Sequence, residues 1–580
     1  MAGEKTQTLA TTWRQFQMIT RAFFASERRH KARVYLIVLL VLALLVGAVQ
    51  ILMSYAFRYF MDAITERNGD RYLPTMAWYL GTIALAIPIG VYYRWVEERL
   101  ALYWREWMAQ HLVKRYFNNR AYFRLRGTEG VDNPDQRISE DVRNFTGSSL
   151  SFLLIGLNSL IALISFVGVL WTISNVLVGL LIFYAFAGTG LSVLIARKLV
   201  RLHYRQYGKE ADFRYGLVRI RDNAESIAFY RGEKREHLDL FNRLTAAVMN
   251  MRTVIIYNRR LAFFTNSYNY IALVLPLLVI APMYMHSKDV GFGVVSQATG
   301  AFAAVLAAVS LIITQFGGLS SYLAGVQRLG SLWDQLDEHD AEEERIAYEA
   351  DNVPDENSRQ VKLNKLNIVT PGNARTLVEE LTFSLSKGQS VIIMGPSGTG
   401  KSSVLRTIAG LWPGNGGTLE RPAFDQLMFL PQRPYMIEGS LRDQLLYPYP
   451  DAGKSEEEIR EVITAANLTD VVERVDNDLD RTVDWANVLS LGEQQRIAFA
   501  RLFLRKPAFA FLDEATSALD EDNQAEIYQM IRDSKTGYIS VGHRTGLIPF
   551  HDRIIMLDRD GSWKMQKTQE YMEESEAANV

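Results

Sequence analysis

Uncharged apolar stretches recur along the first 330 or so residues of the chain. They cover residues 34–55, 73–93, 144–196 and 261–285, with a further one inside 290–327. A bilayer core of about 30 Å takes about 20 apolar helical residues to cross, because unsatisfied backbone groups are costly in lipid. The 144–196 stretch is long enough for two crossings, and Ser and Asn within 172–175 favour a turn between them. The pattern therefore predicts six membrane-spanning helices.

Basic residues mark the expected cytoplasmic side. They collect before the first span, in residues 94–143 and in residues 198–260, whereas the other connections are short or poor in Lys and Arg. Cytoplasmic flanks retain positive charge, so all three basic segments are expected inside the cell. An even number of spans then places both termini in the cytoplasm, in a multi-pass protein of the cell inner (plasma) membrane. The two long basic segments are rich in helix formers, which indicates that the membrane helices continue into the cytoplasm.

Residues 1–33 read as an N-terminal cytoplasmic segment. Aromatic residues at Trp13, Phe16, Phe23 and Phe24 recur at helical spacing beside arginines, which favours an interfacial helix along the membrane surface. A disordered basic tail is the alternative. A secretory signal is disfavoured because the first apolar stretch is too long and lies behind some thirty polar or mixed residues.

Polar residues inside the apolar spans point to a hydrated pathway or to hydrogen bonds between helices, and the sequence leaves both readings open. These residues are Asn158, Asn266, Asn269, Gln297 and Gln315. They form no charged ring or metal-binding cluster, which favours a larger solute over a small ion. The chain has no cysteine and a formal net charge of -1, so a disulfide scaffold and thiolate metal sites are excluded and no basic nucleic-acid footprint is visible.

The composition changes after residue 330. An acidic connector is expected over 331–358, and from 359 to 580 strands and helices alternate as in an α/β domain. The chain therefore divides into the N-terminal segment 1–33, a helical membrane domain at 34–330, the linker and a C-terminal domain.

A phosphate-binding loop of the GxxxxGK[ST] type follows the apolar strand at 390–394. Its glycines let backbone N–H groups turn toward phosphate oxygens, Lys401 reaches the β and γ phosphates, and Ser402 is expected to hold Mg²⁺. The residues expected to bind ATP here are Gly395, Pro396, Ser397, Gly398, Thr399, Gly400, Lys401, Ser402 and Ser403.

A second apolar strand at 507–512 ends in Asp513 and Glu514. This arrangement delivers one carboxylate to Mg²⁺ and its neighbour to the attacking water, so Asp513 is the expected magnesium ligand and Glu514 the general base. An Asp-Glu pair after a strand is more often a surface turn. That reading is disfavoured by the phosphate loop about 110 residues upstream and by the run ATSALD that follows.

Several motifs together resemble the ATPase of ABC transporters. LSLGEQQR at 489–496 is similar to their signature loop, LPQRP around Gln432 to their Q-loop, Ser517–Asp520 to their D-loop and VGHR around His543 to their switch histidine. The resemblance implies that Ser490, Gly492 and Asp520 help bind ATP held by the opposite subunit of a homodimer. It also implies that Gln432 contacts magnesium and that His543 orients the γ-phosphate.

Three further runs resemble the SbmA/BacA group and the related peroxisomal fatty-acyl transporters. They are NPDQRISED at 133–141, NAESIAFYRGE at 223–233 and FLPQRPY at 429–435. This resemblance implies a transporter with an ABC exporter-type fold. Such a transporter would take up peptides, including antimicrobial peptides, or hydrophilic compounds such as cobalamin, by alternating access. An ATP-gated pore or regulator and an exporter of lipid or fatty-acyl cargo are the alternatives.

Three positions depart from the pattern that the resemblance implies. The signature has Leu491 in place of glycine and Glu493 in place of glutamine, so an acidic group is expected nearer the phosphate and hydrolysis is expected to be slow. The aromatic residue expected to stack on adenine is replaced by Thr370, which leaves the recognition of the base open.

Overall fold

The computed structural model describes residues 2–125, 133–286, 290–314, 316–349, 359–370, 375–412, 414–449 and 453–578. The chain divides into two compact units, Met1–Glu342 and Glu343–Val580. The division falls inside a helix, α11 (Phe316–Glu349), so the segment predicted to be an acidic linker begins as helix. Residues 350–358 of that linker lie outside the described residues.

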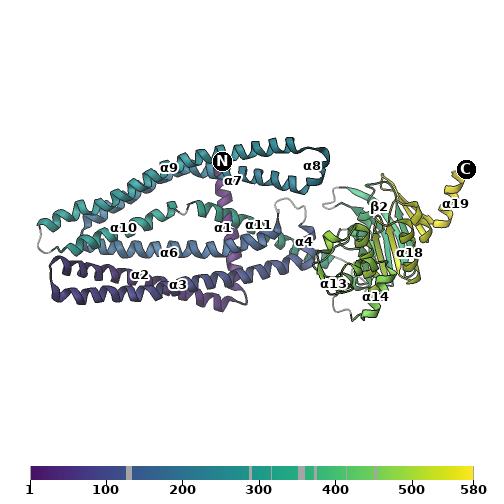
Figure 1. The fold of residues 1–580 in the computed structure, drawn as a ribbon, viewed down its shortest axis with the longest axis horizontal. Helices are drawn as coiled ribbons and strands as arrows, with labels where there is room; N and C mark the ends of the chain where they lie inside the picture. The colour runs from purple at the N-terminus through teal and green to yellow at the C-terminus, as the bar shows by residue number, and fades with distance from the viewer. Residues whose placement is uncertain are drawn as a thin grey trace. The chain divides into compact units, whose positions relative to one another are not determined.

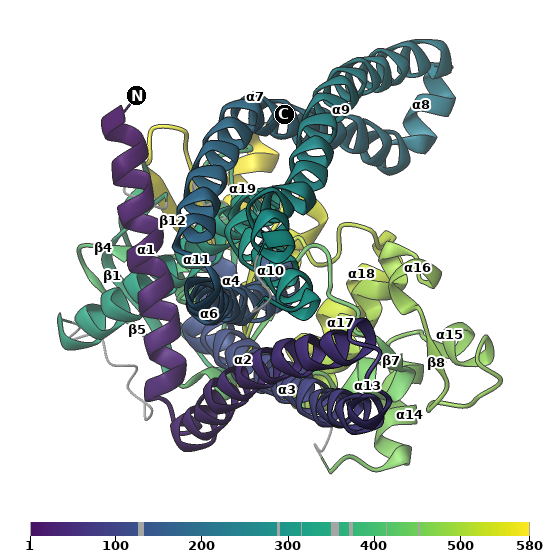
Figure 2. The same cartoon turned by 90° about the vertical axis from the view of Figure 1, so that its left-hand side faces the viewer.

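Long helices with short helical turns between them build the first unit (Figure 1). Before α11 they are α1 (Ala2–Ala25), α2 (Arg29–Thr65), α3 (Gly69–Phe117), α4 (Ala121–Arg124), α5 (Pro134–Gln136), the π-helical turn η2 (Arg137–Asp141), α6 (Val142–Ile173), α7 (Asn175–Asp222), α8 (Ala224–Tyr230), α9 (Glu233–His286) and α10 (Phe292–Thr314). Helices α2 and α3 pack along each other, and α10 packs against α6 and α2. The paired helices α7 and α9 are joined at one end by α8 (Figure 2).

By length and composition, the helices support five of the six predicted membrane spans, and the fourth is represented by a shorter apolar stretch. Among the described residues, five helical segments are long and apolar enough to cross a membrane, and α7 begins with a shorter apolar stretch, Asn175–Gly188. The predicted turn between the third and fourth spans lies at Ser174, whose extended backbone separates α6 from α7. Helices α3, α7 and α9 run unbroken from the apolar stretches into the basic segments, as predicted.

The N-terminal segment is helical, so the disordered alternative is wrong for residues 2–25. Phe23 of α1 is fully buried and stacks on Trp104 of α3, with ring centroids 5.3 Å apart. Asp334 of α11 accepts hydrogen bonds from Arg14 and Gln15. Phe16, Phe23 and Phe24 therefore pack on protein, whereas Trp13 is 59% exposed, and the position of α1 at a membrane surface stays a prediction.

Polar residues of the spans divide between the two readings. Asn158 donates to the Tyr93 hydroxyl on α3 at 2.9 Å, and Gln297 is buried between Arg58 and Ser54 of α2, so both connect helices. Asn266 and Asn269 are exposed on α9 and remain pathway candidates. Gln315 lies outside the described residues.

Tyr184 and Tyr268 join α7 to α9 through a reciprocal contact. Each tyrosine hydroxyl donates to the other residue's backbone carbonyl, at 2.7 and 3.1 Å, and the rings stack at 4.4 Å. A Cβ at Gly188 would lie 2.1 Å from the Tyr268 ring, so glycine leaves the space that the stacked pair needs. The contact fixes the register of the two helices.

The second unit is an α/β domain. Its strands are β1 (Gln360–Val369), β2 (Thr376–Ser386), β3 (Ser390–Met394), β4 (Gly414–Asn415), β5 (Thr418–Glu420), β6 (Leu427–Leu430), β7 (Gly439–Ser440), β8 (Thr482–Val483), β9 (Phe509–Asp513), β10 (Gly537–Val541), β11 (Arg553–Leu557) and β12 (Trp563–Lys567). Its helices are α12 (Lys401–Ile408), α13 (Leu441–Leu446), α14 (Glu456–Ala465), α15 (Thr469–Glu473), α16 (Trp485–Val488), α17 (Leu491–Arg505), α18 (Glu521–Asp533) and α19 (Thr568–Ala578).

The main sheet has the order β12-β11-β3-β10-β9-β6, and β11, β3, β10, β9 and β6 are parallel. One apolar core joins this sheet to α12 and to the antiparallel strands β1 and β2, and another joins it to α17 and α18. Central parallel strands buried on both faces read as unbroken apolar runs, which explains why β3 and β9 were recognisable in the sequence. Their carboxyl ends share one edge of the sheet, where ligands bind in such folds.

Candidate functional site

The phosphate loop connects β3 to α12. Gly395, Gly398 and Gly400 all have φ between +85° and +143°, a region that residues with a Cβ rarely adopt. A Cβ at Gly395 would lie 2.3 Å from the Leu557 carbonyl oxygen, so the turn needs glycine there. The loop therefore has the backbone shape that directs N–H groups at an anion at a helix start.

Lys401 folds back over this loop. Its Nζ donates to the carbonyl oxygens of Gly395 and Pro396 at 2.9 and 2.8 Å. Burial lowers the pKa of Lys401, an effect that the nearby carboxylates of Glu514 and Asp513 oppose. Thr399 also donates to the Pro396 carbonyl, at 3.0 Å. Ser397 and Gly398 are exposed at the tip of the loop, and Ser403 is buried in the first turn of α12.

The predicted magnesium ligands meet in space. Ser402 Oγ donates to Asp513 Oδ1 at 2.6 Å, across 111 positions of sequence. Asp513 ends β9 and the phosphate loop follows β3, with β10 between these two strands. Hydroxyl and carboxylate oxygens are the ligands that Mg²⁺ prefers. The donor set therefore fits this ion.

Glu514 is held from two sides. Its Oε2 accepts from Gln432 Nε2 at 2.8 Å, and its Oε1 lies 3.3 Å from His543 Nε2. Gln432 follows β6 and His543 follows β10, the two neighbours of β9 in the sheet. Glu514 itself has φ +48°, so the chain turns sharply at the end of the strand. The predicted catalytic residues thus converge on one carboxylate.

The signature turn lies at the start of α17 and does not join this cluster within the chain. Ser490 is the helix N-cap, and its hydroxyl donates to Glu493 Oε2 at 2.9 Å. A Cβ at Gly492 would lie 3.1 Å from the Ala518 carbonyl oxygen, so the turn packs closely on the D-loop.

Glu493, the acidic group expected near the phosphate, is engaged by residues of its own chain. Its carboxylate turns back to cap Ser490 and forms an ion pair with Arg474. Burial raises the pKa of Glu493, but hydrogen bonds from Arg474 and Ser490 outweigh it and leave the pKa below its ordinary value. The negative charge is therefore paired inside the unit. Leu491 is exposed at the same turn.

Asp520 caps a helix in this chain. Its carboxylate accepts from the backbone N–H and the side chain of Asn523 at the start of α18, at 2.8 and 2.7 Å. These hydrogen bonds hold the pKa of Asp520 below its usual range. Thr370 Oγ1 accepts from the Arg375 N–H at 3.0 Å, and residues 371–374, next to the expected adenine position, lie outside the described residues.

Sequence reasoning missed two side chains that connect these loops. Gln495 of α17 contacts both the Gln432 backbone and the D-loop, and Arg544 donates to the carbonyl oxygens of Ser517 and Leu519. Arg544 directly follows His543, and Gln495 lies inside the signature run. Their positions next to recognised motifs were the sequence feature that could have identified them.

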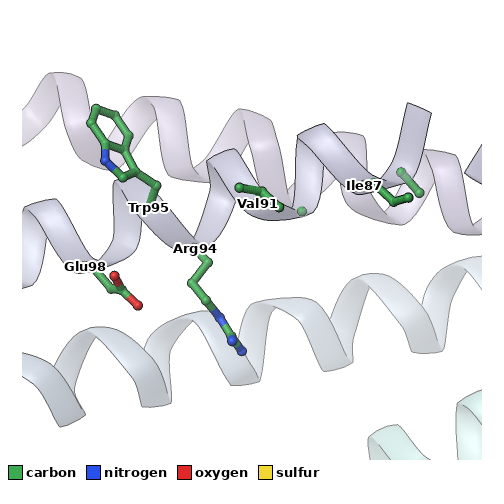
Figure 3. Close-up of a pocket in the computed structure, with 7 residues that line it drawn as sticks. Ile87, Val91, Arg94, Trp95 and Glu98 are labelled. Carbon is green, nitrogen blue, oxygen red and sulfur yellow. The ribbon is translucent and has the colours of Figure 1, made fainter. Parts of the chain in front are cut away.

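A shallow groove of about 650 Å³ lies along α3 in the first unit (Figure 3). Its lining mixes apolar and ionic side chains, namely Ala86, Ile87, Gly90, Val91, Arg94, Trp95 and Glu98. Residues of one helix form this lining, so the groove is open rather than an enclosed binding site.

Comparison with known proteins identifies both units. Residues 19–285 match the family model described as ABC transporter transmembrane region 2, and residues 378–517 match the model described as ABC transporter. The chain is 42% identical over 534 residues to an uncharacterized ABC transporter ATP-binding protein of Synechocystis sp., covering 91% of this chain and 80% of that protein.

Two relatives carry more specific names. ABC transporter D family member 2, chloroplastic, of Arabidopsis thaliana is 36% identical, with 96% of this chain and 87% of that protein covered. The lysosomal cobalamin transporter ABCD4 of Homo sapiens is 32% identical, with 80% and 81% covered. A solved bacterial Atm1-family ABC exporter with ATP bound has a TM-score of 0.73 at 18% identity, covering 93% of this chain and 97% of that chain, so the exporter-type fold predicted from the sequence is confirmed.

Proposed function

The chain belongs to the D family of ABC transporters, and from that premise we propose that two identical copies form an ATP-driven importer of peptides or other hydrophilic solutes such as cobalamin. Its ATPase is coupled to transport, and its first unit is a multi-pass membrane domain. The observation that carries the proposal is the convergence of Lys401, Ser402, Asp513 and Glu514 at one sheet edge, away from the Ser490 turn.

This separation supports a homodimer. A half-transporter of this fold implies a dimer, and the chain contains one phosphate loop and one signature turn. Within the chain, Ser490 bonds Glu493 rather than the phosphate loop. A twofold pair of identical subunits would therefore supply two complete sites, with Ser490 and Gly492 of one copy facing ATP on the other.

The residues of one site have separate roles in this proposal. Ser402, Asp513 and Gln432 would hold Mg²⁺, which when bound would neutralise charge on the phosphates. Lys401 would exchange the two loop carbonyls for phosphate oxygens. Glu514, oriented by Gln432 and His543, would accept the proton of the attacking water.

Transport would follow from the pairing of the two ATPase units. Binding of ATP would bring them together and switch a membrane cavity between its two openings, and hydrolysis would reset it. The charge pattern supports an inner (plasma) membrane location with both termini in the cytoplasm. The ATPase unit would then lie in the cytoplasm, where the cell supplies ATP.

Three observations support the cargo class. The runs at 133–141, 223–233 and 429–435 resemble SbmA/BacA proteins, and one relative is named a cobalamin transporter. The exposed Asn266 and Asn269 on α9 are polar groups that a hydrated pathway would use.

The test uses proteoliposomes preloaded with a fluorescent hydrophilic peptide or with cobalamin. MgATP is added outside, so that only molecules with an outward ATPase unit respond. An importer should release the lumenal cargo faster with MgATP. Glu514→Gln should lower ATPase activity by about 10² to 10⁴ fold, as the loss of a general base does, and should stop release while ATP still binds.

The alternatives predict other results. ATP-driven accumulation of external cargo would mean export and overturn the direction. Equal release by the wild type and the Glu514→Gln variant, both requiring ATP binding, would favour an ATP-gated pore. ATP-driven movement of fluorescent fatty-acyl lipid, with none of peptide or cobalamin, would replace the cargo class.

A further inference from the structure

Gln495 lies at the centre of the hydrogen bonds that join the nucleotide-site loops. It is fully buried on α17, five positions after Ser490. Its Nε2 donates to the Gln432 carbonyl at 2.9 Å and to Ser517 Oγ at 3.2 Å, and its Oε1 accepts from the Ala518 N–H at 3.0 Å. Both amide N–H groups are used, so the side chain has a single orientation that satisfies its partners.

The Q-loop end of this contact leads to the proposed general base. The residue whose carbonyl Gln495 binds is Gln432, and the side chain of Gln432 donates to Glu514 at 2.8 Å. A shift of the Gln432 backbone would therefore move a donor away from the carboxylate. Two hydrogen bonds connect Gln495 to Glu514.

The D-loop end leads to the same carboxylate by a second route. Arg544 binds the carbonyl oxygens of Ser517 and Leu519 at 2.7 and 3.0 Å, and the preceding residue, His543, lies 3.3 Å from Glu514. The segment Ser517–Leu519 is thus held by Gln495 on one side and Arg544 on the other. Gln495 is the buried member of these contacts, and it ties the two loops together because breaking its hydrogen bonds would leave a buried amide unpaired.

The signature turn packs on this same segment. The Ala518 carbonyl oxygen lies 3.1 Å from where a Cβ on Gly492 would stand, so displacement of the turn would press on the D-loop. In the proposed homodimer, this turn faces the ATP of the other subunit. If ATP binding there displaced the turn, Ala518 would move first, and Gln495, which bonds Ala518, would move next.

We propose that Gln495 is a positioning residue that couples occupancy of the opposite nucleotide site to the orientation of Glu514 in its own subunit. This inference rests on the proposed function of the nucleotide site. It makes hydrolysis at the two sites cooperative through a side chain that touches neither ATP nor magnesium. Coupling of this kind appears as a Hill coefficient above 1 for ATP.

The experiment measures steady-state ATPase activity of the full chain in nanodiscs against ATP concentration. Gln495→Met removes all three hydrogen bonds at similar volume. Gln495→Glu keeps acceptors for Ala518 and Ser517 but places a carboxylate against the Gln432 carbonyl. Both variants should reduce the Hill coefficient to 1 and lower kcat by roughly 10-fold, as loss of an orienting contact does, while KM for ATP stays near the wild-type value.

A matched control separates coupling from packing. Gln444 is also fully buried, and its amide bonds the backbone of Ile437 at 2.6 and 2.9 Å without touching the D-loop. Gln444→Met should lower the thermal midpoint at least as much as Gln495→Met and keep the wild-type Hill coefficient. Thermal midpoints measured on all variants confirm that the compared proteins are folded.

The outcomes are distinguishable. A folded wild type without ATPase activity would overturn the proposed function of the site. An active wild type with a Hill coefficient of 1, or a Gln495→Met variant that stays cooperative, would overturn the coupling role while leaving the proposed function intact. Loss of cooperativity in Gln495→Met but not in Gln495→Glu would overturn the link through Gln432.

Discussion

Ser402 Oγ lies 2.6 Å from Asp513 Oδ1, although 111 positions separate the two residues in the chain. The contact exists because β3 and β9 are parallel strands on either side of β10, so the segments that follow them meet at one edge of the sheet. When magnesium is bound, Ser402 would hold it through its neutral hydroxyl and Asp513 through its carboxylate.

Asp513→Asn should weaken the binding of magnesium at this edge, so that ATP hydrolysis requires a higher concentration of free Mg²⁺. An amide keeps the shape of the carboxylate but removes its charge, so the apparent affinity for Mg²⁺ should fall by more than the roughly 10- to 100-fold typical of outer-shell substitutions. The measurement is ATPase activity against free Mg²⁺ at fixed ATP. Asp533→Asn, at the far end of α18, is the control and should follow the wild-type curve. An unchanged magnesium curve for Asp513→Asn would rule out this ligand.

Arg474 should affect ATP binding only through its ion pair with Glu493. Arg474→Ala leaves the Glu493 charge unpaired at the signature turn, where it would repel phosphate, so KM for ATP should rise by roughly 2- to 5-fold, the range of a partly exposed ion pair. The double variant Arg474→Ala/Glu493→Gln should return to the wild-type KM, because the repelling charge is gone. If the double variant stays as impaired as Arg474→Ala, the effect does not run through Glu493.

His551 should make the ATPase unit less stable in acid. Its Nδ1 must donate to the Leu547 carbonyl at 2.8 Å, so Nε2 accepts from Ser540 Oγ, also at 2.8 Å, and the ring is neutral. Burial lowers the pKa of His551 to about 4, from an ordinary value of 6.5. As the pH falls, the unfolded chain therefore takes up a proton at His551 before the folded chain does. The part of the folding stability that depends on neutral His551 is complete above pH 6.5 and is lost as the pH falls toward 4, by about 3 kcal/mol at most.

Hydrogen exchange in β10 measures this effect on the full chain. Corrected for intrinsic rates, amides of Gly537–Val541 should exchange faster at pH 5 than at pH 7.5, because Ser540 bonds the ring. His551→Gln should show a smaller difference between the two pH values. Equal pH dependence in both proteins would refute the role of His551.

Much of the architecture was predictable because it rests on periodic or contiguous signals. The strands before Gly395 and Asp513 are buried on both faces and read as apolar runs, and the uncharged stretches read as spans. The glycines of the phosphate loop were recognisable because only that residue type suits their backbone conformations.

The unpredicted features depend on side-chain direction and on long-range pairing. Glu493 could face phosphate or cap Ser490, and the choice depends on Arg474, 19 positions earlier. Gln495 pairs with Gln432 across 63 positions, which no local pattern encodes. In the sequence, Asn158 and Gln297 fit a hydrated pathway and an interhelical contact equally well. The choice depends on Tyr93 and Arg58, which lie beside them on other helices.

The most direct measurement of the central claim mixes two inactive chains. Lys401→Met disables the phosphate loop and Ser490→Arg disables the signature turn, so each variant alone should lack ATPase activity. In a purified heterodimer with two different tags, one composite site keeps Lys401 from one chain and Ser490 from the other. We predict that this heterodimer regains vanadate-dependent nucleotide trapping, which neither homodimer shows. A heterodimer that traps no nucleotide, or a monomer that hydrolyses ATP at the wild-type rate, would contradict a site shared between two copies.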